Sequence, residues 1–344
     1  MEFPSYPPLH MHPKYLVAGP LQRDFVIQSD GRSRLDFIGG AGAFAAAGMA
    51  IWGGPIGLLS RVGEDYPREW LHDLSHHQID TRGVKIIPEI MDLRSFYGYT
   101  EPDEFETANP VKHFARHSIP FPSILLNYKP IREHKIGIDT VLPTSPRSND
   151  APPEYLDAIA AHLCPMDYLT QSLLQPVLRS GMLKTISIEA HPSYMQPENW
   201  HKLSSIVSGL TIFTVNEDSL RLFFRNRSED LVEMAEAVTK LGCEMVIISQ
   251  ADGTKILVEL TSRKKWLIPA YPVDRMNAHS SRAAFGGGTL AGYQKTYSPL
   301  EAVIHGVVTE SIASEGFHPV SMFDTLVGLA DARLGVLREM IRPL

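Results

Sequence analysis

The residues whose types are best suited to binding or catalysis lie in the stretch NAHSSRAAFGGG, residues 277 to 288. Ser280, Ser281 and Arg282 come just before a helix that we expect at about 283–295. Hydroxyl groups, a guanidinium and the unbonded N–H groups at a helix start together suit a phosphate or a carboxylate. The same residues also permit a simpler interpretation, in which Ser281 caps the helix and Arg282 points into solvent.

The elements that must position this stretch alternate along the chain between strands and helices. Strands are expected at Tyr15–Gly19, Phe25–Ile27, 55–62, 84–87, 184–189, 211–215, 244–249, 255–259 and 265–269. Helices are expected in an Ala-rich run that ends near Ile51, and at 67–77, 153–162, 170–180, 198–208, 229–241, 283–295, 299–314 and 322–340. Residues 92 to 150 show no clear pattern. The alternation predicts an α/β protein with a doubly wound, mainly parallel sheet, in which ligands bind beyond the carboxyl ends of the strands.

Composition limits the kinds of protein that this chain can be. It has 344 residues, of which 44% are hydrophobic and 21% are charged, which suits one globular domain over residues 1–344. The net charge of −7 and the absence of a basic run argue against nucleic acid or an anionic membrane as a partner. Cys164 and Cys243 lack metal-ligand spacing, so we expect two buried thiols in a reducing cytosol.

We expect a soluble cytoplasmic protein without a metal site. The first residues lack the charged and apolar regions of a signal peptide, and no apolar run reaches membrane-spanning length. The pairs His10 with His12, and His76 with His77, have no acidic or cysteine partners at the spacing of metal ligands.

Several motifs follow one another in an order that is specific to one group of enzymes. LLSRVGEDYPREWLHDLSHHQIDTRGV covers residues 58 to 84, and FGGGTLAGY, residues 285 to 293, leads into a helical run. Together with the pair Gly39 and Gly40, these motifs resemble the ribokinase-like (PfkB) carbohydrate kinase family over most of the chain, from Tyr15 to Pro319.

The resemblance implies a ribokinase-like α/β domain with a small β lid, formed by residues of about 28–38 and 84–130. It also implies transfer of the γ-phosphate of ATP, with Mg²⁺, to a hydroxyl of a sugar or nucleoside. Arg94, Phe96 and Tyr99 then either line the lid over the substrate or form an ordinary edge strand with one buried face. Such an edge also permits a homodimer through the lid.

On the substrate side, the resemblance assigns a ligand-binding role to Asp24, which follows Gly19 by five residues. A carboxylate there accepts hydrogen bonds from two hydroxyl groups, unless Asp24 has only a surface role at the end of a strand. Gly39 and Gly40 match the family's paired glycines, which allow the backbone to approach the ligand closely. Phe44 stands where the sugar kinases usually place an asparagine, which suggests an altered ligand.

The catalytic base of the family is missing from this chain. In the family, the run Asp-Thr-Thr-Gly-Ala-Gly-Asp and one small residue come directly before the phenylalanine that matches Phe285. The last aspartate of this run takes the proton of the attacking hydroxyl. In this sequence that aspartate falls at Ala283, the two glycines fall at Ser280 and Arg282, and the first aspartate falls at Asn277. Because a methyl group accepts no proton, the resemblance implies a kinase without its usual base.

Further departures fall on the positions that the family uses for the nucleotide and its metal ion. The family's Asn-x-x-Glu retains Asn216, but its glutamate is Ser219, with Glu217 or Asp218 as a stand-in. The other departures are Ala251 and Thr254 in place of two nucleotide-side glycines, and Val307 in place of an asparagine beside the nucleotide. These changes remove groups on which phosphoryl transfer depends.

Three hypotheses remain open at this point, and the sequence does not name the ligand. The first is an impaired or inactive kinase-like protein that binds a polyol, a nucleoside or a phosphorylated ligand between Asp24, the two glycines and the loop of the 280s. The second is an active ATP-dependent kinase whose base has moved. The candidates for that base are Asp252, Asp274, Glu310 and Glu315. The third is a non-catalytic protein that dimerises through its lid.

Overall fold

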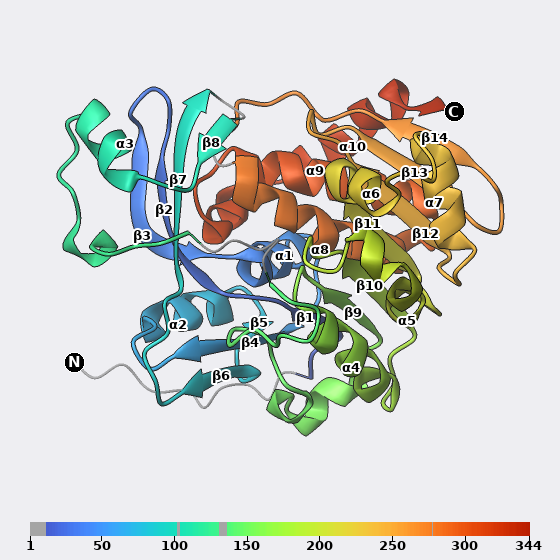
Figure 1. Cartoon of the computed structure of the whole chain (residues 1–344), viewed down its shortest axis with the longest axis horizontal. Helices are drawn as coiled ribbons and strands as arrows, with labels where there is room; N and C mark the ends of the chain where they lie inside the picture. Colours follow the sequence, from blue (N-terminus) through green and yellow to red (C-terminus); the bar gives the residue numbers. More distant parts are fainter. Residues whose placement is uncertain (1–11, 102–103, 131–135, 277) are drawn as a thin grey trace.

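The computed structural model describes residues 12–101, 104–130, 136–276 and 278–344. In these residues eleven strands form one large sheet in the order β15-β14-β13-β12-β11-β10-β9-β1-β4-β5, with β6 also paired to β4 (Figure 1). They are β1 (Tyr15–Ala18), β4 (Ile56–Gly63), β5 (Ile79–Asp80), β6 (Val84–Ile87), β9 (Ala160–Leu163), β10 (Thr185–Glu189), β11 (Ile212–Asn216), β12 (Met245–Ser249), β13 (Lys255–Glu259), β14 (Lys265–Ile268) and β15 (Arg342–Pro343). The strands up to β12 pair in parallel, whereas β13, β14 and β15 pair antiparallel. The predicted α/β architecture with a mainly parallel sheet is confirmed.

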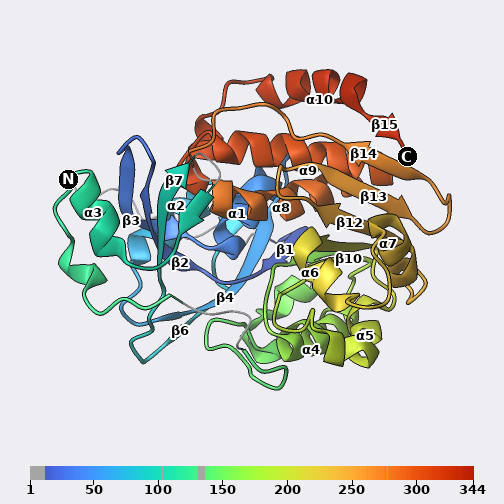
Figure 2. The ribbon, with the colours of Figure 1, turned by 45° about the horizontal axis from the view of Figure 1, so that its top comes forward.

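Helices cover both faces of this sheet, as Figure 2 shows. On one face lie α1 (Ala41–Ala50), α2 (Arg68–His76), α8 (Ala278–Thr296) and α9 (Pro299–Ser314), with α10 (Leu329–Met340) packed against α9. On the other face lie α4 (Tyr168–Arg179), α5 (Leu203–Val207), α6 (Glu217–Phe223) and α7 (Leu231–Thr239). Since side chains alternate along a strand, Val17 joins the first hydrophobic core and Leu16 joins the second.

The glycines of FGGG serve close packing between helices. A Cβ atom on Gly287 would lie 1.9 Å from the carbonyl oxygen of Ala45, so no larger residue fits between α8 and α1. This close approach holds the middle of α8 against α1, which begins directly after the pair Gly39 and Gly40.

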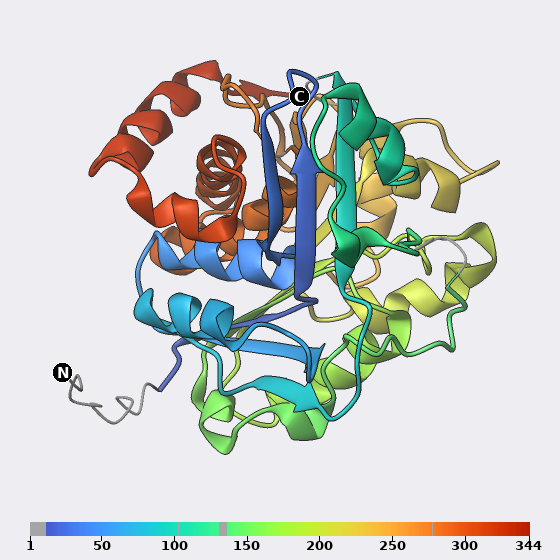
Figure 3. The ribbon, with the colours of Figure 1, turned by 90° about the vertical axis from the view of Figure 1, so that its left-hand side faces the viewer.

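A second sheet of four strands forms the lid, in the order β3-β2-β7-β8 (Figure 3). Its strands are β2 (Gln22–Ile27), β3 (Ser33–Gly39), β7 (Arg94–Glu101) and β8 (Glu104–Glu106). One face packs against α3 (Pro110–Arg116) and residues 119–128 in a cluster around Phe25 and Phe96. The other face carries Tyr97 and Tyr99. Since β7 has a neighbour on each side, the alternative of an edge strand at Arg94, Phe96 and Tyr99 is wrong.

The lid differs from its expected extent at both segments. Residues 22–27 belong to it as β2, and residues 84–87 instead pair with β4 in the large sheet. The stretch 92–150, which showed no pattern, contains β7, β8 and α3.

Three predicted helices begin or end elsewhere. The helix expected at 153–162 is wrong, because Pro153–Asp157 forms a short 3-10 helix and 160–163 is the central strand β9. Its alanines favour a helix, but burial between two parallel neighbours decides for the strand. The helix expected at 283–295 begins five residues earlier, at Ala278. The helix expected at 322–340 begins at Leu329.

Two simpler expectations concern the cysteines and the membrane. Cys164 and Cys243 are both buried and both free, as predicted. Within the described parts of the chain, every helix falls short of the length and apolar character that spanning a bilayer would require.

Candidate functional site

Asp24 lies in the middle of β2 and is completely buried, so its predicted alternative role on the surface is wrong. Its Oδ2 atom accepts a hydrogen bond of 3.1 Å from the hydroxyl of Ser280, and the N–H of Gly40 also interacts with the carboxylate. Among the described residues, the Oδ1 atom has no hydrogen-bond partner. Burial raises the pKa of Asp24 to about 7, against the opposing effect of the hydrogen bonds from Ser280 and Gly40.

The paired glycines close around this carboxylate, as the sequence predicts. A Cβ atom on Gly39 would lie 2.0 Å from the Cγ atom of Asp24, so a side chain there would displace the carboxylate. Phe44 lies in α1 and is fully buried in the hydrophobic core of the large sheet and its helices, which we call the body. The structure therefore joins Asp24, Gly39 and Gly40 in one place, and it gives Phe44 a role in packing.

His279 lies beside the aromatic side chains of the lid. Its ring centroid is 4.6 Å from that of Tyr97 and 4.8 Å from that of Phe105. Its backbone N–H donates a hydrogen bond of 3.1 Å to the hydroxyl of Tyr99. Although His279 keeps an exposed side, the dense packing around it and the nearby Arg282 lower the pKa of its imidazole.

The groups that the sequence assigned to a phosphate, on Ser280, Ser281 and Arg282, lie inside the first turns of α8 and not before it. Because the helix already begins at Ala278, the N–H groups of Arg282 and Ala283 donate to carbonyls of its first turn. Ser281 lies inside the helix, so its predicted role as the cap is wrong. The guanidinium of Arg282 donates to the carbonyl oxygen of Ala251 at 3.2 Å. Asn277 lies outside the described residues.

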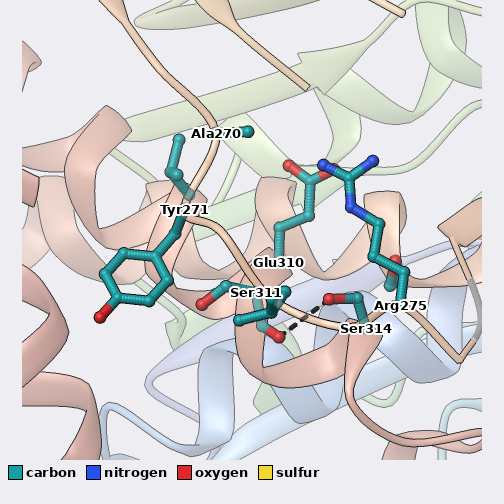
Figure 4. Close-up of a pocket in the computed structure, with 9 residues that line it drawn as sticks. Ala270, Tyr271, Arg275, Glu310, Ser311 and Ser314 are labelled. Atoms are coloured by element: carbon teal, nitrogen blue, oxygen red, sulfur yellow. Dashed lines mark hydrogen bonds between the residues drawn. The ribbon is translucent and has the colours of Figure 1, made fainter. Parts of the chain in front are cut away.

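A small pocket lies on the side of α8 that the resemblance assigns to a nucleotide, which we call the nucleotide side (Figure 4). It is lined by Ala270, Tyr271, Val273, Arg275, Ser281, Val307, Glu310, Ser311 and Ser314. The space open to the centre of a water-sized sphere is about 10 Å³. That is room for roughly one water molecule.

Charged side chains that pair with one another fill the surroundings of this pocket. The ammonium of Lys255 lies 2.9 Å from the carboxylate of Glu310, and the exposed fractions of the two side chains are 2% and 14%. The same ammonium lies 4.6 Å from the ring centroid of Phe285. The guanidinium of Arg333 bonds both carboxylate oxygens of Glu315 at 2.8 Å.

The four carboxylates predicted as relocated bases are therefore not equivalent. Glu310 and Glu315 each form an ion pair, with Lys255 and Arg333 respectively. Asp252 accepts hydrogen bonds from the N–H and hydroxyl of Thr254, and Asp274 is exposed. Of the four, only Glu310 lines the pocket next to Ser281.

The remaining predicted residues have local partners. Asn216 caps α6 by accepting a hydrogen bond of 2.7 Å from the N–H of Ser219. Glu217 bonds Gln250 and Arg221, and the hydrogen bond from Gln250 is the main reason why the pKa of Glu217 is lowered. In the described part of the chain, no group of three or more His, Cys, Asp or Glu side chains is placed to hold a metal ion.

Arg94 also differs from its predicted role. Its guanidinium bonds the carboxylate of Asp92 and the carbonyl oxygens of Ile124 and Leu126. It therefore fastens the covering segment 119–128 to the lid.

The sequence missed three of the contacts that define the two sides of α8. From the sequence alone, a histidine in the polar run NAHSSR, such as His279, is expected to be a polar turn residue, and neither Lys255 nor Arg333 stands out. Lys255 opens an apolar strand, KILVE, and Glu310 interrupts an apolar helix. A charge in such a run is a signal for a buried pair, although the sequence does not show which charges meet.

Comparisons with known proteins show which proteins this chain is similar to. No protein-family model matches the chain. A cytidine kinase from Thermococcus kodakarensis is 26% identical over 292 residues, which cover 84% of this chain and 91% of that protein. The structure of aminoimidazole riboside kinase from Salmonella enterica, complexed with aminoimidazole riboside and an ATP analog, matches with a TM-score of 0.63 and 14% identity over 93% of this chain and 99% of that one.

A Burkholderia thailandensis nucleoside kinase in complex with inosine matches with a TM-score of 0.64 and 12% identity, over 94% of this chain and 98% of that one. These likenesses show the ribokinase-like fold. They also confirm the resemblance to ribokinase-like sugar and nucleoside kinases that the motifs predicted.

Proposed function

We propose that this chain is a kinase-like protein that binds a polyol or nucleoside between its lid and its body and does not transfer phosphate. The observation that carries the proposal is the start of α8. The position of the family's base is Ala283, and the N–H groups of Arg282 and Ala283 serve the helix itself. No acid at this position takes a proton, and these two amides are not available to a developing phosphate charge.

The expected loss of rate is large. Removing a general base typically costs about 10²–10⁴-fold, and removing one donor to a developing anion costs about 10²–10³-fold. Phosphoryl transfer depends almost wholly on such positioning and charge stabilisation. The two losses together therefore leave little of the family's catalysis.

The nucleotide side supports the same conclusion. The pocket beside Ser281 and Val307 has about 10 Å³ of free space. Glu310, which lines this pocket, pairs with Lys255 at 2.9 Å. ATP and Mg²⁺ remain the cofactors that the fold would use if it were active, but these side chains would first have to move apart.

The lid side supports retained binding. Asp24 keeps a buried oxygen without a partner in the described structure, and Gly39 lies directly against the carboxylate with no side chain between them. A ligand with hydroxyl groups satisfies such an oxygen. A phosphorylated ligand at the 280s has less support, because Ser280 faces Asp24 and Arg282 bonds the carbonyl of Ala251.

An active nucleoside kinase is the second candidate. It is favoured by the similarity to a cytidine kinase over 91% of that protein. It requires a base, and Glu310 is the candidate nearest to Ser281 through the pocket that both line. The carboxylate of Glu310 is engaged with the ammonium of Lys255 at 2.9 Å, so it would have to leave this pair to reach a substrate hydroxyl.

The third hypothesis, a homodimer through the lid, has less support. The segment from α3 to residue 128 covers one face of the lid, and Tyr97 and Tyr99 on the other face pack with Phe317. The edges β3 and β8 are the parts of the lid that remain for a partner. The two buried free thiols support a reducing compartment such as the cytoplasm.

Calorimetry with Mg-ATP and an assay of ADP release test the proposal, with cytidine, adenosine, ribose and fructose as acceptors. Asp24→Asn is the matched background, because it removes the charge and keeps the size of the side chain. We expect no heat of ATP binding, and the same ADP release from both proteins. We also expect at least one acceptor to bind the wild-type chain and not Asp24→Asn. ADP release by the wild-type chain above the background of the variant would overturn the proposal.

A further inference from the structure

Met276, His279 and Ser280 each form a hydrogen bond with a residue in or next to the lid. Gln28, which follows β2, donates a hydrogen bond from its side chain to the carbonyl oxygen of Met276. The N–H of His279 donates to the hydroxyl of Tyr99 on β7. The hydroxyl of Ser280 donates to Asp24 on β2. These partners lie about 250, 180 and 256 positions away along the chain, so the contacts join the lid to the body.

Ser280 occupies a position that a ligand hydroxyl would take. Its hydroxyl reaches the buried carboxylate of Asp24 at 3.1 Å, and the side chain itself is buried. The second carboxylate oxygen of Asp24 stays without a partner in the described structure. The single hydroxyl of Ser280 therefore satisfies one carboxylate oxygen of Asp24, whereas two neighbouring hydroxyl groups of a ligand would satisfy both.

His279 adds a flat ring next to that hydroxyl. Its imidazole is tilted by 32° against Tyr97 and stands at 63° to Phe105, which is the offset and edge-on contact of aromatic pairs. The two consecutive side chains thus present a heteroaromatic ring to the lid and a hydroxyl to the carboxylate. A nucleoside presents the same two groups, joined through its sugar.

We propose that His279 and Ser280 are a built-in occupant of the ligand cleft, which a nucleoside must displace before it binds. The inference rests on the proposed function, because it takes Asp24 as the residue that meets the ligand. The contacts of Met276, His279 and Ser280 hold the lid on the body. Displacement frees both the carboxylate of Asp24 and the aromatic surface of Tyr97 and Phe105 for the nucleoside.

The double variant His279→Ala/Ser280→Ala tests the proposal. Alanine is the best helix former, so α8 is expected to persist. Ser75→Ala/His77→Ala is the matched control. It removes a hydroxyl that bonds only a backbone carbonyl, and an imidazole that stacks on Phe323 at 4.0 Å, both at the end of α2.

Hydrogen exchange of the full-length proteins without ligand gives the first measurement. The variant loses a hydrogen bond to a carboxylate and an aromatic contact between lid and body. We expect the amides of β2 and β7 to exchange at least about tenfold faster than in the wild-type chain and in the control. Unchanged exchange in these strands would overturn the proposal.

Calorimetry with cytidine and ribose gives the second measurement, and its sign separates an occupant from a merely structural contact. We expect the variant to bind cytidine at least about tenfold more tightly than the wild-type chain, because no side chain has to leave. Ribose, which has no aromatic base to place on Tyr97, should gain less. The control should match the wild-type chain.

The outcomes also separate this inference from the proposed function. Equal affinity of the wild-type chain and the variant for cytidine overturns the inference alone. Failure of both proteins to bind cytidine, adenosine, ribose and fructose overturns both. ADP release by the wild-type chain overturns the proposed function, and tighter binding by the variant would still support the occupant.

Discussion

The two sides of α8 treat their charges in opposite ways. On the lid side, Asp24 is a buried carboxylate with one hydroxyl partner and one oxygen unpaired among the described residues. On the nucleotide side, Lys255 neutralises Glu310, and Arg333 neutralises Glu315. An unpaired buried charge lowers stability, whereas a paired one is held in place. The lid side therefore keeps the character of a ligand site, and the nucleotide side has that of a structural core.

Two nearby residues of α8 contact its two sides. Ser280 and Arg282 both stand where the resemblance places a glycine, and they lie in the first two turns of one helix. Ser280 points to Asp24, and Arg282 reaches the carbonyl of Ala251 on the other side. The side chains of Ser280 and Arg282 thus contact groups on the two sides of α8. The N–H groups of Arg282 and Ala283 form hydrogen bonds within the helix.

The largest expected effect is on the nucleotide side. Lys255→Met leaves the carboxylate of Glu310 in the interior without its cation, which typically costs about 3–5 kcal/mol. We expect the free energy of unfolding in urea to fall by that amount. The double variant Lys255→Met/Glu310→Met should recover most of the loss, because it leaves no buried charge.

A surface pair supplies the control for that prediction. Lys112 lies 3.4 Å from Glu106, and the side chains of both residues are exposed. Lys112→Met should change the free energy of unfolding by less than about 1 kcal/mol. A loss for Lys255→Met as small as that for Lys112→Met would contradict the structural role of the buried pair.

The next effect concerns pH on the lid side. The pKa of Asp24 is raised by burial to about 7, from an ordinary value of 3.8. Between these values the unfolded chain has released the proton and the folded chain still holds it, so stability falls as the pH rises from about 4 to 7. Asp24→Asn does not titrate. At pH 8 it should be more stable than the wild-type chain, by on the order of 4 kcal/mol, and at pH 4 the two should be alike.

Urea unfolding of both proteins at pH 4, 6 and 8 measures this difference. Other titrating groups, such as the buried His162, are present in both proteins and cancel in the comparison. A difference between variant and wild type that does not change with pH would show that Asp24 is ionised without a penalty. It would then resemble Glu310 on the other side of α8, and the contrast between the two sides would fail.

The sequence was sufficient where local signals decide the structure. Ser298 and Pro299 mark the start of α9, and its predicted range, 299–314, agrees with the observed one. The order of the motifs predicted the fold, and the pairing of Asp24 with Gly39 and Gly40 followed from it. These features depend on neighbours in the chain or on patterns that the whole family shares.

The start of α8 was not predictable in the same way. The residues NAHSSR offer several possible caps, and the predicted cap was Ser281. The observed start coincides with contacts to Tyr99 and Asp24, which are 180 and 256 positions away. Such contacts leave no trace in the local pattern. The missing base at Ala283 was visible from the sequence, whereas the engagement of the neighbouring amides was not.

The smallest expected effect is the most direct test of the contrast. Ala283→Asp restores a carboxylate at the position of the family's base. If the base were the only missing part, ADP release should rise by about 10²–10⁴-fold. We expect no rise, because the N–H groups of Arg282 and Ala283 remain in the helix and the pocket beside Ser281 has about 10 Å³ of space. Ala283→Asn, which has the same size and no charge, is the control in the ADP assay with cytidine and Mg-ATP. Release by Ala283→Asp above that of Ala283→Asn would mean that the nucleotide side opens readily, and that its ion pairs form a gate to an otherwise competent site.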